Sequence, residues 1–472
     1  MNQNTPINRL PPEILTKTLE FRKSDKDLIY ATQVCHRWRS TLSSAPSLWT
    51  EVVFRDSSSR VLTYLTRSKT FPIDVSFKPT RVSFETWKFD PEDLYASRIP
   101  WVNRMKSLDI GGDEEQIEAI VRRLCLPAPL LQCLRFDGRP NRTLVWRTPG
   151  AVYFPPNFLG GQAPSLQSLS FNSISPNPTI RLPLPNLTSF TWIDKASKVT
   201  IKDFLTLLTS APLLEVMDIH LQVRSVSTAE RTTVVALNKL RELTWSNSGG
   251  TFSLTSCLIA PELNWLSLRV IPAPGYAQSD LADILPLHAG HFPLLVEPTE
   301  MRYTTRRGRR SCNFSSTMGH IGITVLPGSY NDATHSFAWL SRNTPISFRQ
   351  TKQLVMEEDF PPLGEIPIER FESLESLELV GGAGIRFLLM RPYRPTLNGA
   401  LVVPFPTLLE LHTTSDASLP LDALAEVLME RRQAGYGLET VRIRGECAEP
   451  TEELVSKMKE SVGELVLDLV RS

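Results

Sequence analysis

The sequence has 472 residues, more than a single hydrophobic core usually organises, so a compound or elongated architecture is expected. Lys and Arg total 51 against 50 for Asp and Glu, a formal net charge of +1 that argues against a general attraction to nucleic acid or anionic lipid. The sequence contains no run of about 18 apolar residues, so no transmembrane helix is predicted. The N-terminal residues do not show a positive segment followed by an apolar core, so no secretory signal is predicted.

The cysteines are scattered without a CxxC pair, at Cys35, Cys125, Cys133, Cys257, Cys312 and Cys447. This spacing disfavours a zinc cluster or a disulfide framework, and reduced thiols predict a cytoplasmic or nuclear protein. Proline is unusually frequent, with 37 residues spread along the chain. Prolines at regular intervals usually separate short elements, which is a first sign of a repeated fold.

The first fifty residues predict a small helical unit. Pro11 and Pro12 can open a helix because a first-turn residue has no intrahelical backbone donor to lose. Further on, apolar residues recur at steps of three and four, the period of one helix face, at Leu28, Ala31, Cys35, Trp38 and Leu42. This helix is expected to end near 45–46, with Leu48 and Trp49 folding back onto it. A unit of about 45 residues should lean on a partner or on the rest of the chain for stability.

In order and spacing this segment resembles the F-box motif. The matching residues are Leu10-Pro11-Pro12-Glu13-Ile14-Leu15, Asp27-Leu28, Val34-Cys35-His36-Arg37-Trp38-Arg39 and Leu48-Trp49. The resemblance implies a three-helix F-box domain at 1–52 that binds the Skp-type adaptor, and through it the cullin, of a Skp–cullin–F-box ubiquitin ligase. The adaptor contacts that it implies by motif position are Leu10, Pro11, Ile14, Leu15 and Leu28. The residues expected in the core of this domain are Cys35, Trp38, Leu42 and Trp49. The alternative is an unrelated amphipathic helical hairpin.

A second pattern, Leu-x-x-Leu-x-Leu, recurs in the rest of the chain and alternates as a half-buried strand does. The copies are APLLQCLRF (128–136), APSLQSLSF (163–171), LPNLTSFTW (184–192), APLLEVMDI (211–219), LNKLRELTW (237–245), APELNWLSL (260–268), FESLESLEL (371–379) and FPTLLELHT (405–413), with weaker copies at 102–110 and 435–443. Where copies are consecutive, their first leucines lie about 21 to 35 residues apart, close to the length of leucine-rich repeats. Helix starts are expected between copies at Asp113-x-x-Gln116, Thr200-x-x-Asp203 and Asp422, with Gly435 closing the last helix.

Strand followed by helix, repeated, predicts a solenoid in which neighbouring units bury each other's faces. The pattern resembles a degenerate leucine-rich repeat domain, as found in some F-box proteins, although the asparagine or cysteine ladder of well-formed repeats is absent. The expected fold class is therefore α/β, with the three-helix F-box followed by an irregular leucine-rich-repeat-like α/β solenoid at 53–472. The alternative is a non-repetitive α/β domain that favours leucine.

Residues 270–360 break the repeat. Candidate strands lie at 320–325 and 344–348, and helical stretches at 279–287 and 333–340. The densest positive run of the chain, RRGRRS (306–311), is also here. It could be a nuclear-import signal, a phosphate-binding patch or a ligand for an acidic substrate tail, while a solvated loop is the simpler interpretation. At 452–472 a helix followed by a strand at 465–469 is expected to cap the last repeat.

No constellation of catalytic or metal-binding residues is found. His288 and His291 lack the adjacent glutamate of a metalloprotease motif, and the glycines at 381–384 lack the spacing and the lysine of a phosphate loop. We therefore expect no metal, no cofactor and no enzyme activity of the chain itself. An enzyme site hidden in 270–360 is the weakest alternative.

The predicted function is that of a substrate receptor that acts by proximity. The adaptor holds the F-box, the solenoid holds an unknown client protein, and a separate subunit transfers ubiquitin. No membrane or nucleic-acid partner is expected. The client surface is predicted at outward strand positions, namely Gln167, Ser170, Thr188, Thr191, Arg241, Thr244, Asn264 and Ser267. A repeat scaffold that uses its N-terminal helices for assembly, with no ligase role, is the alternative.

Overall fold

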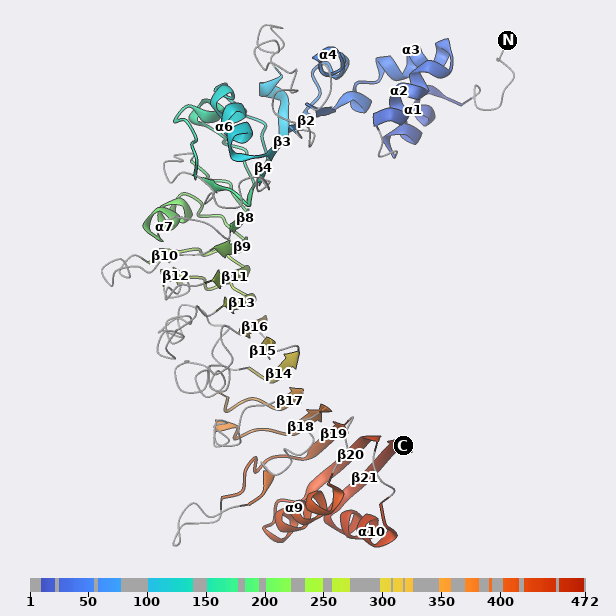
Figure 1. Cartoon of the computed structure of the whole chain (residues 1–472), viewed down its shortest axis with the longest axis vertical. Helices are drawn as coiled ribbons and strands as arrows, with labels where there is room; N and C mark the ends of the chain where they lie inside the picture. Colours follow the sequence, from blue (N-terminus) through green and yellow to red (C-terminus); the bar gives the residue numbers. More distant parts are fainter. Residues whose placement is uncertain are drawn as a thin grey trace. The chain divides into compact units, whose positions relative to one another are not determined.

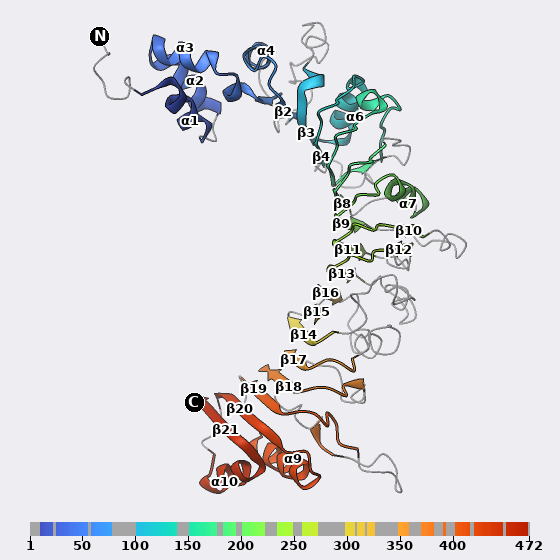
Figure 2. The same ribbon diagram turned by 180° about the vertical axis from the view of Figure 1, so that it is seen from behind.

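A computed structural model gives the fold of the chain (Figures 1 and 2). It describes residues 10–21, 25–54, 58–77, 101–138, 151–176, 183–194, 201–221, 234–248, 257–271, 298–306, 309–316, 319–325, 348–357, 370–381, 390–392, 402–415, 420–446 and 450–470. Internal contacts divide the chain into two compact units. Unit 1 comprises residues 1–199 and 203–214, and unit 2 comprises residues 200–202 and 215–472.

Unit 1 begins with short helices and then forms a parallel sheet. The helical part is α1 (Pro12–Glu20), α2 (Asp25–Val34), α3 (His36–Ser44), the 3-10 helix η2 (Pro46–Trp49) and α4 (Ser58–Arg67). The strands, each pairing in parallel with the next, are β1 (Glu51–Val53), β2 (Ile73–Phe77), β3 (Met105–Gly112), β4 (Cys133–Gly138), β6 (Ser168–Asn172) and β8 (Ser189–Asp194). The remaining elements are η4 (Val102–Arg104), α6 (Glu114–Arg123), β5 (Ala151–Val152), η5 (Phe158–Gly161), β7 (Ser175–Pro176) and α7 (Ile201–Thr209), most of which belongs to this unit.

The expectation of one continuous helix through 28–42 is wrong. Cys35 is extended, at φ −159° and ψ 170°, and α3 begins after it. A straight helix would spread Leu28 to Leu42 over about 21 Å, at 1.5 Å per residue. The break instead lets α2 and α3 fold together, so that Ala31 and Leu42 meet Leu15 of α1 in one cluster. Burial of a shared core therefore overrides the helical period.

Unit 2 continues the parallel pattern with one interruption. Parallel pairs join β9 (Val216–Leu221) to β11 (Glu242–Ser248), β11 to β13 (Trp265–Ile271), and β13 to β16 (Gly319–Val325). Parallel pairing resumes from β14 (Glu300–Arg306) through β17 (Gln353–Glu357), β18 (Ser376–Val380), β19 (Glu410–Ser415), β20 (Leu438–Glu446) and β21 (Val462–Val470). Off the ladder lie the paired strands β10 (Val235–Ala236) and β12 (Leu258–Ile259) and the helices α9 (Leu421–Gln433) and α10 (Glu452–Ser461).

The interruption lies within the irregular stretch. There β15 (Arg309–Ser316) pairs in antiparallel fashion with both β14 and β16. Of the RRGRR run, Arg306 ends β14 and pairs with Arg309 at the start of β15, while 307–308 lie outside the described residues. The candidate strand at 320–325 is confirmed as β16. The predicted helices at 279–287 and 333–340, and all but Phe348 of the strand at 344–348, lie outside the described residues.

The leucine pattern is confirmed by burial. In the copy at 128–136 the three pattern residues Leu131, Leu134 and Phe136 are buried, and their counterparts in the other seven well-matched copies are buried as well. Before these strands a tight turn recurs, in which the carbonyl of Ala128, Ala163 or Ala260 accepts a hydrogen bond from the leucine three residues later. Proline follows that alanine because its fixed φ suits the second position of such a turn. The regular prolines therefore mark repeat boundaries.

Several predicted element ends are also confirmed. Asp113 caps α6 through both bonds of a capping box with Gln116. Gly435 follows α9 with φ +87°, a left-handed conformation that glycine adopts at low cost. At the C-terminal end α10 and β21 form the expected helix and strand. Asp203 lies in the first turn of α7, whereas Thr200 lies outside the described residues.

Candidate functional site

The N-terminal helices form a small core of their own. Leu15 of α1, Ala31 of α2 and Leu42 of α3 are buried together. Leu19, Trp38 and Leu48 pack against them while remaining partly exposed. With three short helices around a few apolar side chains, the unit buries little surface and depends on further contacts for stability.

The chain enters this unit through an arm at Leu10 and Pro11, both of which are exposed. The arm is held in place, because the guanidinium of Arg37 in α3 donates a hydrogen bond to the Leu10 carbonyl, with Nη2 2.8 Å from O. The Pro11 carbonyl accepts from the amides of Ile14 and Leu15 at 3.1 and 3.2 Å, which starts α1. These hydrogen bonds therefore hold the apolar residues Leu10 and Pro11 in a defined position.

The five residues implied as adaptor contacts fall into two classes in the structure. Leu10 and Ile14 are 37% and 46% exposed, and Pro11 is exposed beside them. Leu15 and Leu28 are only 6% and 9% exposed. Leu10, Pro11 and Ile14 therefore present apolar surface to solvent, whereas Leu15 and Leu28 are buried within the helical unit.

Other exposed apolar side chains of this unit were missed by motif matching. Tyr30 and Val34, four residues apart on α2, are both 63% exposed, and Phe21 after α1 is more exposed still. Val34 ends α2 just before Cys35, and Arg37, which bonds to Leu10, lies in the first turn of α3. The available signal was helical spacing, because Tyr30 and Val34 lie off the buried stripe of Leu28 and Ala31. Exposed apolar side chains on one small helical unit are typical of a protein-binding site.

The residues expected in the F-box core are buried to different degrees. Leu42 and Trp49 are fully buried, Trp38 is partly exposed at the edge of the core, and Cys35 is half-buried at the start of α3. Cys35 is a free thiol.

Trp49 joins the helical unit to the sheet that follows it. Its indole Nε1 donates to the Leu42 carbonyl at 2.8 Å. Its ring meets Tyr64 of α4 edge-on, with centroids 4.9 Å apart, and Arg67 of α4 lies 4.3 Å over it. Trp49, directly before β1, thus packs α3 and α4 together.

The outward strand positions offer a second kind of candidate surface, the strand face, on each unit taken by itself. The predicted positions Gln167, Ser170, Thr188, Thr191, Arg241, Thr244, Asn264 and Ser267 are all exposed or half-buried. Buried residues alternate with them, as in β8, where Phe190 and Trp192 face the core and Thr191 does not. A polar face on a rigid set of strands can bind a partner without rearranging the core.

Chemical sites are scarce in the part of the chain that the structure covers. Among the described residues, no group of three or more His, Cys, Asp or Glu side chains could hold a metal ion. None of the helices there is both long and apolar enough to cross a membrane. His288 and His291 lie outside the described residues, and Gly381 follows β18 with φ +69°, as a turn residue does.

Comparisons with known proteins inform the N-terminal helical unit but not the strand face. Residues 7–55 match the model of the F-box-like family, which confirms the resemblance of the N-terminal segment. No curated protein matches the chain. Among solved structures, the chain in "Crystal structure of TLR13-ssRNA13 complex" is similar at 12% identity, with a TM-score of 0.29, over 82% of this chain and 48% of that chain. The present chain thus spans about half the length of that one. The repeat character of the present chain is seen in its own parallel strand register.

Proposed function

We propose that this chain is the substrate-recognition subunit of a Skp–cullin–F-box ubiquitin ligase. The observation that carries the proposal is the exposed apolar arm on an F-box-like helical unit. Leu10, Pro11 and Ile14 would contact the Skp-type adaptor directly, while Leu15 and Leu28 would shape the surface from below. Burying such side chains against a partner supplies binding free energy of about 25 cal/mol per Å² of apolar surface, before the costs of association.

The strand face would hold the client protein. A separate catalytic subunit, recruited through adaptor and cullin, would transfer ubiquitin to a client lysine. This chain then contributes a raised effective concentration of the lysine and needs no acid, base or cofactor of its own. The buried contacts of Trp49 are consistent with this role, since they fix α3 against α4 directly before the first strand of unit 1.

The direct test is co-purification of the full chain with a Skp-type adaptor. The wild-type chain should bind, and the double variant Leu10→Asp, Pro11→Ser should bind at least about tenfold more weakly, because interface anchors of this kind dominate affinity. The free energy of unfolding of the double variant should stay within about ±0.5 kcal/mol of wild type, as for ordinary surface substitutions. Its melting temperature should therefore change little. Leu130→Asp is the matched control, since Leu130 is an exposed leucine outside the helical unit, at 45% against 37% for Leu10.

Buried contacts should behave differently. Leu15→Ala should lower the stability of the helical unit by about 2–5 kcal/mol, as core truncations do, and weaken adaptor binding only through unfolding. A folded wild-type chain that fails to bind the adaptor would overturn the ligase proposal. Adaptor binding without cullin in the complex would favour the scaffold alternative. Unfolding of the whole chain by the arm variants would show that the arm is core and not interface.

A further inference from the structure

The strands β9, β11, β13 and β16 of unit 2 follow one another in the sheet (Figure 1). Strand register places Val216 of β9, Glu242 of β11, Trp265 of β13 and His320 of β16 side by side in one row. Trp265 is 46% exposed and is a large aromatic side chain on a face where most neighbours are small or polar. An indole held in water on a rigid strand gains nothing for folding from its exposed half, and such aromatics are typical binding anchors.

One face of the indole is covered from within the row. The His320 imidazole stacks on Trp265 with ring centroids 4.6 Å apart and planes 28° apart. The stack is supported from β15, where the Ser315 hydroxyl lies 3.3 Å from His320 Nδ1. Adjacent strands are about 4.8 Å apart, so a planar group on a neighbouring strand is at the right distance to lie against the indole.

The neighbour of Trp265 on its other side in the row is Glu242, which has no ring to stack on the second face of the indole. Glu242 occupies that position on β11, exposed and without an ion-pair partner among the described residues. The nearby cations are already engaged, because Glu262 pairs with Lys239 at 2.9 Å and lies 3.9 Å from Arg241. The hydrogen bond from Lys239 lowers the pKa of Glu262. On β9, Asp218 pairs with His220 at 2.9 Å.

We propose that Trp265 and Glu242 form a recognition site for an arginine side chain of the client, an inference that rests on the proposed receptor function. The guanidinium would stack on the open indole face and extend two N–H groups to the Glu242 carboxylate. A planar cation suits both partners at once, whereas the ammonium of lysine is compact and cannot stack. Val216, 37% exposed beyond Glu242, would take an apolar neighbour of that arginine. Arg269, the exposed cation on β13, lies further along the strand and outside this row.

The experiment is a selection of random displayed nonapeptides on the immobilised full chain, followed by affinity measurement with the purified winners. The winners should share an arginine. Changing that arginine to glutamine should weaken binding at least about tenfold, and changing it to lysine should weaken it less. Trp265→Ala should weaken binding by a similar factor, and Glu242→Gln by about three- to fivefold, as for an exposed charge pair. Tyr436→Ala, at an exposed aromatic residue of unit 2 outside the row, is the matched control and should change nothing.

Winners without arginine, or winners that bind Trp265→Ala as well as wild type, would overturn the inference. Enrichment of purely apolar peptides that depend on Trp265 would do the same, because it would make the indole an apolar anchor. The Trp265→Ala chain should keep its melting temperature and its adaptor binding. Adaptor binding is measured separately, so lost arginine selectivity leaves the ligase proposal standing, and lost adaptor binding leaves the arginine site standing.

Discussion

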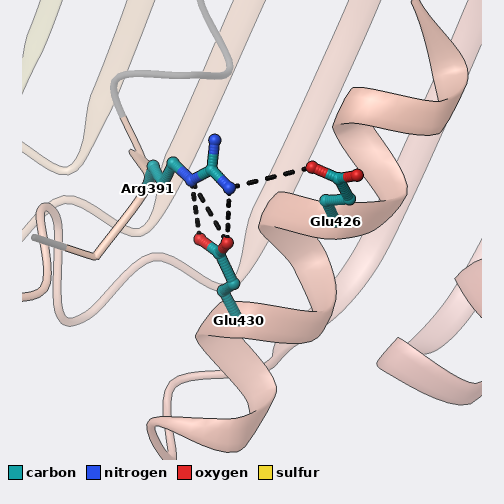
Figure 3. Close-up of polar contacts among 3 residues, drawn as sticks. All are labelled: Arg391, Glu426 and Glu430. Carbon is teal, nitrogen blue, oxygen red and sulfur yellow. Dashed lines mark hydrogen bonds and ion pairs between the residues drawn. The ribbon is translucent and has the colours of Figure 1, made fainter.

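Two arginines fix the segment 390–392 to α9 in contrasting ways. Arg391 is half-exposed and binds the Glu430 carboxylate through Nε at 2.9 Å and Nη2 at 2.6 Å, with Glu426 3.7 Å away (Figure 3). The hydrogen bond to Glu430 raises the pKa of Arg391. Arg431 is fully buried, and its guanidinium donates to the carbonyls of Met390, Pro404 and Phe405 at 3.2, 2.6 and 2.9 Å. One arginine therefore forms a solvated ion pair, and the other satisfies three buried acceptors.

Arg431→Met should destabilise unit 2 by about 2–4 kcal/mol, because buried carbonyls lose a charged donor and are left unsatisfied. Arg391→Met is the matched control and should change stability little, since an exposed ion pair contributes little. Urea denaturation of both variants checks this. Equal losses would contradict the assignment of Arg431 as the structural member of the pair.

The pH dependence of the Arg431 contribution follows from the same burial. Desolvation lowers the pKa of Arg431 to about 10, so the side chain stays charged at neutral pH. Between that value and the higher pKa of an arginine in the unfolded chain, the unfolded chain binds more protons, so this group makes stability rise with pH only in that window. The stability difference between wild type and Arg431→Met should therefore be constant from about pH 6 to 9. A slope in that range, measured by denaturation at several pH values, would contradict it.

At the scale of elements, helix starts could be predicted from side-chain chemistry. The α6 box uses Asp113 Oδ1 for the Gln116 amide at 2.9 Å and Gln116 Oε1 for the Asp113 amide at 3.0 Å. On α10 only one such bond forms, from the Leu454 amide to Thr451 Oγ1 at 3.3 Å. Both caps are local, so the residues that make them lie within one turn of sequence.

Asp113→Ala should therefore cost about 1 kcal/mol, the usual loss for an N-cap. Amide hydrogen exchange should rise at the first turn of α6. Thr451→Ala on α10 is the comparison and should cost less, since it breaks a single longer bond. An unchanged exchange rate at Gln116 and Ile117 in Asp113→Ala would show that tertiary packing, and not the cap, holds the start of α6.

Strands without an apolar alternation of their own could not be predicted in the same way. The Leu-x-x-Leu-x-Leu strands were predicted because each copy shows its own alternation, but β14 and β15 were not. In that hairpin Met301 and Phe314 are buried and face each other across the strands, within a stretch rich in arginine and threonine. What makes these segments strands is their pairing with each other and with β16 and β17, which depends on context. The turn at Cys35 was missed for the same reason.

For the whole molecule, sequence located the helical unit and the strand face but could not sort direct contacts from support. Leu15 and Leu28 belong to the same motif as Leu10, and only packing shows that they are buried. Trp265 occupies a position that is Ser168 in β6 and Glu242 in β11, so the alternation predicts an outward side chain and nothing about its partner. The stack on His320 joins residues from β13 and β16, 55 positions apart, which spacing alone does not bring together.

Trp49 gives a test of how far one contact reaches along the repeat. Trp49→Ala removes the hydrogen bond to Leu42, the edge contact with Tyr64 and the cation above the ring, and should cost about 3–5 kcal/mol. Because repeats mostly stabilise their neighbours, hydrogen exchange should rise in α3, η2 and α4 and stay unchanged in α9 and α10 of unit 2. Leu10 and Pro11 lie outside the lost contacts, so adaptor binding should persist at temperatures where α1 to α3 remain folded. Tyr153→Ala, at an exposed aromatic residue of unit 1, is the control and should leave all of these helices unchanged. Faster exchange in α9 and α10 of Trp49→Ala would instead mean that the chain unfolds as one cooperative body.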